Sequence, residues 1–333
     1  MITHPPIDRF LIVLFGITLL PLSAFAGAGE FIGNWAIKMN NSDAGWLTLE
    51  VVDNQFTGQL WSVGQSKNLA DFDFANNELT FTRNLRVGNP EFPGGPPTGD
   101  RVPCSHTATV DGDTITLVTT LPDQSTLTHT GKRLPPLPDA PDLSQVKFGE
   151  PVSLFNGTDL SGWKLSNPEH RNGWKAADGI LVNETPKETF DPFSRYGNLR
   201  TEGVFGDGKL EIEFNVPPGG NSGIYVRGAY EAQVVDRDSR MQGIQGVGAI
   251  FGRIEPTKMA GKVGGEWQKY EITIVDRHAT VILNGETVID NQPIVGNTMG
   301  AYQSDITSPG PLYLQGDHTS VQYRNIFFHP VVD

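Results

Sequence analysis

The chain has 333 residues, with 38 Gly, 24 Pro and a formal net charge of −13 at pH 7. This acidity excludes charge-driven binding to nucleic acid or to an anionic lipid surface. The single cysteine, Cys104, excludes an intrachain disulfide. At this length we expect two domains, each large enough to bury a hydrophobic core.

The N-terminal segment has the pattern of an export signal. Residues 10–27 read FLIVLFGITLLPLSAFAG, an apolar core followed by the small-x-small pattern Ala24-Phe25-Ala26. The run is short for a membrane span, and it contains a glycine and a proline. We therefore predict that residues 1–26 are a signal peptide cleaved after Ala26 and that the protein is secreted or periplasmic. No apolar run in residues 27–333 is long enough to cross a membrane.

The mature sequence is predicted to be all-β. Short runs rich in Val, Ile, Thr and aromatic residues recur between turn signals, and long helical-period patterns are absent. We expect residues 27–133 to form a small accessory domain, either an antiparallel β-barrel or a sandwich. It has no catalytic constellation, and His106 and His129 are expected on strand surfaces. Its predicted strands are 46–51, 56–61, 79–83, 107–110, 114–119 and 126–130.

A proline-rich segment, residues 134–148, is predicted to be a semi-stiff linker. The second domain is expected over residues 149–333. Asn284-Gly285, between two apolar alternating runs, predicts a tight hairpin. The predicted strands of this domain are 209–216, 223–227, 230–236, 267–275, 279–284, 286–290, 311–315 and 321–329.

Strand alternation predicts a polar face in the second domain. If four of its strands share a sheet, their apolar residues form a core and their polar residues the other face. Amides and carboxylates bind sugar hydroxyls, and aromatic rings cover the apolar side of a sugar, so we predict a sugar site. The alternative is that these residues form the solvent-exposed face of an ordinary antiparallel sheet, with no binding function. The predicted face carries Glu211, Glu213, Tyr225, Arg227, Glu231, Gln233, Tyr313 and Gln315.

Characteristic segments follow one another through the second domain. They include LFNGTDLSGW (154–163), KLEIEFNVPPGGNSGIYVR (209–227), GEWQKYEITI (265–274) and GPLYLQGDHTSVQYRNI (310–326). Together they resemble the DUF1080 family, also called the 3-keto-disaccharide hydrolase family, over about residues 149–331. The resemblance implies a concanavalin-like jelly-roll β-sandwich in an exported bacterial enzyme. Its substrates would be sugars whose C3 hydroxyl has been oxidised to a ketone.

The implied chemistry needs three groups. A C3 ketone acidifies the C2 proton, so a base can form an enolate and the C1 substituent can leave, with hydrolysis as the other outcome. The site then needs a base, an oxyanion stabiliser and an acid. We assign Glu231 as the base, with Glu213 as second choice or as a partner carboxylate that raises the pKa of Glu231. Arg227 would stabilise the oxyanion, unless it only pairs with Glu231, and His318 would be the acid or a second base.

Other polar residues are assigned to substrate binding, with a structural alternative for some. The alternative for Asn221, Ser222 and Gly223 is a simple turn, and the alternative for Arg324 is a purely structural role in fixing the closing strand. No cofactor is required by the sequence, although carboxylates and backbone oxygens would suit Ca²⁺, so the metal stays open. No dinucleotide fingerprint is present, so a separate 3-dehydrogenase must supply the ketone. The predicted substrate-binding residues are Asn221, Ser222, Tyr225, Gln233, Asp236, Gln315 and Arg324.

Three functions are compatible with the sequence. The first is the cleavage of 3-keto-glycosides, and the second is non-catalytic, lectin-like carbohydrate binding, because this fold serves both roles. The third is an ordinary retaining glycosidase, which needs two carboxylates about 5–5.5 Å apart. Glu211 and Glu213 are compatible with that spacing. A binder needs only amides and aromatic rings, so the several ionisable groups of the predicted face favour an enzyme.

Overall fold

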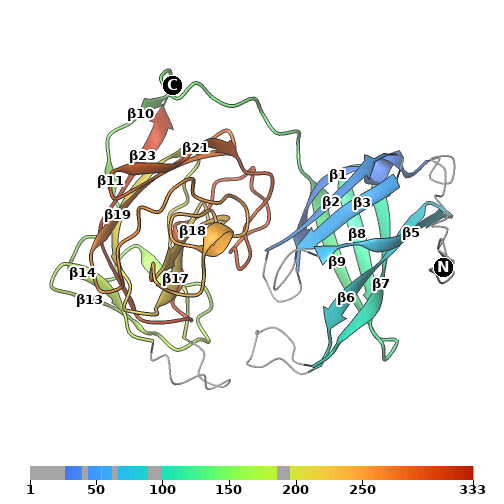
Figure 1. Cartoon of the computed structure of the whole chain (residues 1–333), viewed down its shortest axis with the longest axis horizontal. Coiled ribbons are helices and arrows are strands. Elements are labelled where there is room, and N and C mark those ends of the chain that lie inside the picture. Colours follow the sequence, from blue (N-terminus) through green and yellow to red (C-terminus); the bar gives the residue numbers. More distant parts are fainter. Residues whose placement is uncertain are drawn as a thin grey trace, which may run out of the picture.

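The computed structural model describes residues 27–39, 44–53, 55–61, 67–88, 99–185 and 196–332. The predicted signal peptide lies outside these residues. Two β-rich domains are joined by a long connection (Figure 1). Within the described residues the helices are two short 3-10 turns, Ala28–Phe31 (η2) and Gly243–Gln245 (η3). The all-β prediction is therefore confirmed. No helix in this part of the chain has the length and apolar character needed to cross a membrane.

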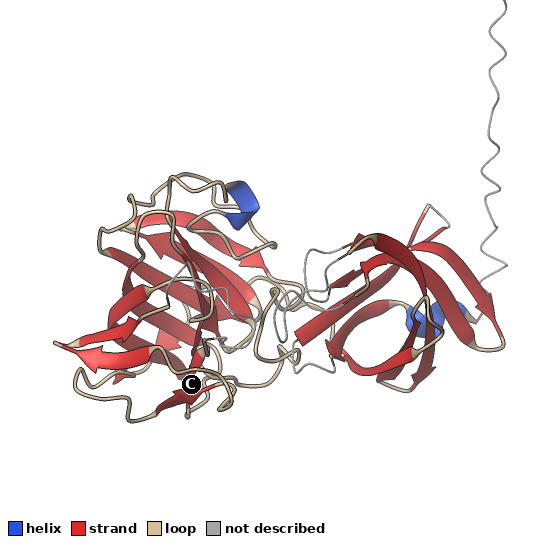
Figure 2. Ribbon diagram, turned by 90° about the horizontal axis from the view of Figure 1, so that it is seen from below, coloured by secondary structure: helices blue, strands red, loops and turns tan. Residues whose placement is uncertain are grey.

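The first domain is a nine-stranded antiparallel meander with the order β4-β3-β2-β1-β9-β8-β7-β6-β5. Because β9 pairs with β1, the sheet curls around its core into a barrel (Figure 2). The strand order leaves β4 and β5 as the two edges. All six predicted strands are present. The bounds are β1 (Gly33–Lys38), β2 (Ala44–Val52), β3 (Gln55–Trp61), β4 (Lys67–Asn68), β5 (Ala70–Ala75), β6 (Glu78–Arg86), β7 (Arg101–Asp111), β8 (Thr114–Thr120) and β9 (Thr126–Arg133).

The two histidines of the barrel correct a prediction. His106 and His129 are only 1% and 6% exposed, because each occupies an inward position of its strand. The His106 ring stacks on Phe81 and its Nδ1 lies 2.9 Å from the Thr119 hydroxyl. Burial lowers the pKa of His129 and lowers that of His106 to about 4. Both histidines are therefore neutral core residues rather than surface residues.

The second domain is a sandwich of two sheets, which confirms the predicted jelly-roll fold. The larger sheet has the order β13-β14-β23-β16-β19-β20-β21, with β10 and β11 also paired to β23. The smaller sheet has the order β12-β15-β22-β17-β18. The bounds are β10 (Lys147–Phe148), β11 (Val152–Ser153), β12 (Trp163–Leu165), β13 (Trp174–Ala177), β14 (Ile180–Asn183), β15 (Leu199–Thr201), β16 (Gly208–Asn215), β17 (Asn221–Val226), β18 (Tyr230–Val235), β19 (Gln268–Val275), β20 (His278–Leu283), β21 (Glu286–Pro293), β22 (Tyr313–Leu314) and β23 (Val321–Val332).

Apolar residues at alternate positions fill the space between the two sheets. Ile212 and Phe214 of β16 and Ile224 of β17 are fully buried in one cluster. Burying one such side chain stabilises the fold by roughly 1.5–3 kcal/mol. The predicted hairpin at Asn284-Gly285 is confirmed, because Leu283 pairs with Glu286 and both turn residues have positive φ, 53° and 84°, as a tight two-residue turn requires.

The sheet arrangement corrects the predicted polar face. Strand β16 lies in the larger sheet, whereas β17, β18 and β22 lie in the smaller one. Glu211 and Glu213 therefore face outward from the opposite side of the sandwich from Glu231. Glu213 accepts hydrogen bonds from Arg324 (2.7 Å) and Asn325 (2.8 Å) on the neighbouring strand. Glu211 pairs with Lys209 at 3.0 Å and with Lys269 at 2.9 Å.

The first domain packs directly on the second. The Arg253 guanidinium lies 4.3 Å from the centroid of the Trp46 ring and 3.7 Å from that of Trp61. Ala44, at the start of β2, packs in a small apolar cluster with Tyr225 and Tyr313. The connection between the domains is also held, because Asn291 donates a hydrogen bond to the carbonyl of Pro141 (3.0 Å).

Candidate functional site

The outward face of the smaller sheet gathers polar and aromatic side chains from three strands. Tyr225 of β17 is paired with Tyr313 of β22 on one side and with Glu231 of β18 on the other. The Tyr225 and Tyr313 rings meet edge to face, with centroids 4.9 Å apart. One step along the strands, Gly223 is paired with Gln233, and its carbonyl accepts a hydrogen bond from the backbone of Gln315. The structure thus brings together five residues of the predicted polar face: Tyr225, Glu231, Gln233, Tyr313 and Gln315.

Glu231 lies over a glycine that leaves room for its side chain. A Cβ on Gly223 would stand 2.2 Å from Oε1 of Glu231, so only glycine accommodates the carboxyl in this position. Glu231 is 3% exposed, and burial raises its pKa to about 8. The charge of Asp317 adds to this shift, whereas hydrogen bonding to Tyr225 and the proximity of His318 oppose it. At neutral pH this carboxyl is mainly protonated, as an acid catalyst requires.

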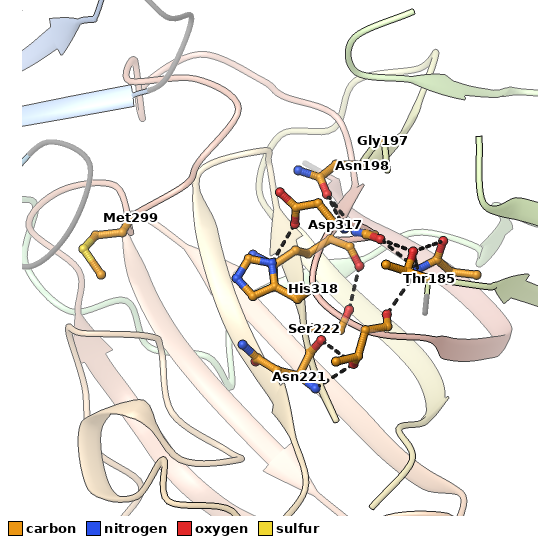
Figure 3. A network of polar contacts seen from close by, with 12 residues as sticks. Thr185, Gly197, Asn198, Asn221, Ser222, Met299, Asp317 and His318 are labelled. Carbon is orange, nitrogen blue, oxygen red and sulfur yellow. Dashed lines mark hydrogen bonds and ion pairs between the residues drawn. The ribbon is translucent and has the colours of Figure 1, made fainter. Parts of the chain in front are cut away.

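A tight turn after β22 supplies the second ionisable group (Figure 3). His318 Nδ1 lies 2.7 Å from Oδ1 of Asp317, and the side chains are 45% and 6% exposed respectively. The buried carboxylate therefore orients an exposed imidazole. With Nδ1 held in this way, Nε2 is the ring nitrogen that can exchange a proton with a substrate.

Asn198 and Thr319 hold this turn against the sheet. Asn198 Oδ1 accepts the backbone N–H groups of Gly316 (2.7 Å) and Asp317 (3.2 Å), and Nδ2 donates to the Tyr313 hydroxyl (2.6 Å). The Thr319 hydroxyl accepts from the backbone N–H of Asn221 and donates to its carbonyl, both at 2.8 Å. The turn that carries His318 is thereby tied to β17 and to the start of β15 (Figure 3).

Sequence analysis missed these supporting residues. Asp317 stands next to a predicted catalytic histidine, so a search for an orienting carboxylate could have found it. Asn198 is 118 residues distant from Gly316 in the chain, and nothing in the sequence around it indicates the contact. The backbone N–H of Glu231 is also bound by a remote residue, because it donates to the Thr298 hydroxyl (3.0 Å).

Arg227 is not part of this site. Strand β17 ends at Val226, and Arg227 has a left-handed φ of 56°, so it departs from the strand alternation on which its assignment depended. Its Nη1 pairs with Asp207 at 2.5 Å, and Nη2 donates to the carbonyls of Ile306 and Ser308, both at 3.1 Å. Both its assignment as an oxyanion stabiliser and the alternative ion pair with Glu231 are therefore wrong.

Four further assignments are also corrected. Ser222 points between the sheets, where its hydroxyl lies 2.8 Å from that of Tyr323. Asp236 accepts the N–H groups of Gly219 and Gly264, which lower its pKa and show that it holds two loops together. Glu213 and Arg324 pair with each other on the larger sheet, where Arg324 also lies over the Trp267 ring. None of these four side chains reaches the outward face of the smaller sheet.

The remaining predicted residues lie within or beside the site. Gln233 is 1% exposed and donates to the carbonyl of Gln245 (3.1 Å), so it is covered by a loop. Asn221 and Gln315 are half-buried at the border of the face, next to the turn that carries His318. Across the described residues, no group of three or more His, Cys, Asp or Glu side chains could hold a metal ion.

Several solved structures resemble part of the chain. Two proteins of Parabacteroides distasonis ATCC 8503, each provisionally described as a glycosyl hydrolase, are similar to it. One is 19% identical with a TM-score of 0.45, covering 55% of this chain and 94% of that one. The other is 25% identical with a TM-score of 0.43, covering 60% and 93%. The carbohydrate binding module CBM66 from Bacillus subtilis is 13% identical, with a TM-score of 0.34 and coverage of 51% and 96%. No protein of curated function matches the sequence.

The second domain is a jelly-roll domain of the carbohydrate-active enzymes, with ionisable groups gathered on one face. The chain belongs to the family described as the 3-keto-alpha-glucoside-1,2-lyase-like domain, whose model matches residues 150–329. The match spans more than half of the 333 residues and confirms the family resemblance. The first domain lies outside it.

Proposed function

We propose that this protein is an exported, secreted or periplasmic enzyme that cleaves 3-keto-glycosides or 3-keto-disaccharides. The family match supports this substrate class. The single observation that carries the proposal is the buried Glu231, with its pKa raised to about 8, near the exposed His318 that Asp317 orients. A binding protein has no need of a carboxyl and an imidazole held in this way.

The proposed reaction is an elimination across C1 and C2 of the oxidised sugar. Nε2 of His318 takes the C2 proton, and the electron pair of the C2–H bond forms the enolate of the C3 ketone. The enolate then forms the C1–C2 double bond as the C1–oxygen bond breaks, and Glu231 protonates the departing oxygen. Later addition of water gives the products of net hydrolysis.

These roles differ from those expected from the sequence, where Glu231 was the base. A carboxyl whose pKa is raised to about 8 holds its proton at neutral pH and is better suited to donate it. His318 has the more accessible side chain and takes the role of base. The ketone must come from a reaction that oxidises the C3 hydroxyl of the sugar, which we assign to a separate dehydrogenase.

The test is product release from 3-keto-glucosides, measured by mass spectrometry, with the unoxidised parent glycosides alongside. We expect wild type to cleave only the keto sugars. Glu231→Gln and His318→Asn should each reduce kcat by about 10²–10⁴-fold, the usual contribution of a general acid or base. Glu213→Gln, on the opposite sheet, is the matched control and should cleave at a rate close to that of wild type.

Three outcomes would contradict the proposal. Binding of keto sugars without cleavage would indicate a lectin-like protein. Cleavage of the unoxidised parents would indicate an ordinary glycosidase. Full activity in both site variants would place the reaction elsewhere. An arm with EDTA tests directly whether activity depends on a metal.

A further inference from the structure

A cavity of about 830 Å³ lies away from the catalytic face, against the barrel of the first domain. One wall is the outward face of β2 and β3 with the neighbouring strand β4. The other wall comes from the second domain, at Gly252, Arg253, Pro293 and Val295. A space of this size is typical of small-molecule and saccharide sites.

The strand register explains why this wall is polar. Leu47, Leu49 and Leu60 point into the barrel core, so the residues between them point outward. They form cross-strand rows in which Thr48 stands beside Gln59 and Asn68, and Glu50 stands beside Thr57. Gln59 Nε2 donates to Oδ1 of Asn68 at 3.2 Å, which holds two amides side by side.

The chemistry of the wall favours a neutral, polyhydroxylated ligand. Hydroxyls, amides and two carboxylates line the cavity and offer both donors and acceptors. The half-buried Phe72, whose ring centroid lies 5.7 Å from that of the core residue Phe56, adds an apolar surface. Among the described residues lining the cavity, Arg253 is the one cation, and it is enclosed by two indole rings and donates to the carbonyl of Asn297. Glu50 and Asp71 disfavour anionic ligands.

Strand β2 connects the cavity wall to the catalytic half of the molecule. Ala44 packs on Tyr225 and Tyr313, and Trp46, two residues further on, lines the cavity. Two residues of extended strand span roughly 7 Å. We propose that the cavity binds the unoxidised remainder of an oligosaccharide whose 3-keto end lies at the catalytic face. The saccharide-binding role stands on the cavity itself, and the link to the keto end rests on the proposed function.

Isothermal titration calorimetry of the full chain with unoxidised maltotetraose, cellotetraose and laminaritetraose tests this. We expect at least one tetrasaccharide to bind wild type. Thr57→Trp places a bulky side chain in the cavity from an exposed strand position, and it should weaken binding at least tenfold. Thr109→Trp is the matched control, because Thr109 is also an exposed strand residue but lies on β7, outside the cavity wall. Gln59→Ala, a milder change, should weaken the same binding without filling the space.

The outcomes separate the two proposals. If no tetrasaccharide binds wild type, or if Thr57→Trp and Gln59→Ala bind as wild type does, the cavity is not a saccharide site. If binding is sensitive to Thr57 but wild type does not cleave 3-keto-glucosides, the proposed function fails while the saccharide site stands.

Discussion

Two glutamates of this protein, Glu231 and Glu211, show how strongly the surroundings of a carboxyl set its acidity. Glu231 is enclosed by protein and lies over Gly223, and burial raises its pKa to about 8. Glu211 is partly exposed, and hydrogen bonding to Lys269 is the largest effect lowering its pKa to about 2. A raised pKa is common among functional carboxyls, whereas a lowered one is common in surface ion pairs.

The stability of the protein should therefore depend on Glu231 as pH rises. Between an unfolded pKa of 4.5 and a folded pKa of about 8, the folded state keeps a proton that the unfolded state loses. The free energy of unfolding should then fall across this window and level off above it. The free energy of unfolding of Glu231→Gln should match that of wild type below about pH 4.5 and exceed it above about pH 8. The difference should reach up to a few kcal/mol, at about 1.4 kcal/mol per pKa unit. Urea unfolding at a series of pH values measures this.

Glu211→Gln is the matched comparison and should behave in the opposite sense. Because its folded pKa is depressed, Glu211 contributes stability above about pH 4.5 that is lost as pH falls towards 2. The variant should therefore be slightly less stable than wild type at pH 7, by less than about 1 kcal/mol because the pair is partly solvated. If Glu231→Gln and wild type showed parallel pH profiles, the raised pKa of Glu231 would be wrong.

At the level of the strands, alternation in the sequence was a reliable guide to faces but not to sheets. It correctly separated Ile212 from Glu213 and placed Tyr225, Glu231 and Gln233 together. It could not show that β16 belongs to the other sheet, because sheet membership depends on pairing with strands far away in the chain, such as β23. The family resemblance located the domain, but the contacts of Arg227 depend on a single left-handed residue.

The turn that carries His318 should be sensitive to Asn198. Asn198→Leu removes the acceptor for two backbone N–H groups and the donor to Tyr313. We expect kcat for 3-keto-glucosides to fall about 10- to 100-fold with a smaller change in KM, because the imidazole loses its orientation. The pH dependence of kcat should also change, since Asp317 no longer holds the ring in one position.

Two further variants make this a test of positioning. Asn198→Asp keeps an acceptor for the turn and should recover part of the activity. Asn215→Leu removes a half-buried asparagine of the opposite sheet that donates to the carbonyl of Gly265, and it should leave kcat unchanged. A pH profile of Asn198→Leu that is identical to wild type would indicate a purely structural role.

At the scale of the whole molecule, Arg253 joins the two domains. Its guanidinium lies against two indole rings of the barrel, and burial lowers its pKa to about 9. We expect Arg253→Ala to lower the free energy of unfolding by about 1–3 kcal/mol, because it removes two cation–π contacts and leaves a gap. In calorimetry the two domains should then unfold at more widely separated temperatures.

Arg240→Ala changes an exposed arginine of the second domain and serves as the control. It should leave the calorimetric trace unaltered. An unaltered trace for Arg253→Ala as well would show that the domains do not depend on this contact for their association.

The position of β23 has a consequence for how the chain is made. This strand lies inside the larger sheet, between β14 and β16, and also pairs with β10 and β11. During synthesis those strands leave the ribosome long before residues 321–332, and until then they lack the neighbour that joins them. The barrel is complete by residue 133 and can fold while the rest is translated. The sandwich can close only after its last strand has emerged, so the half of the molecule that carries Glu231 and His318 matures last.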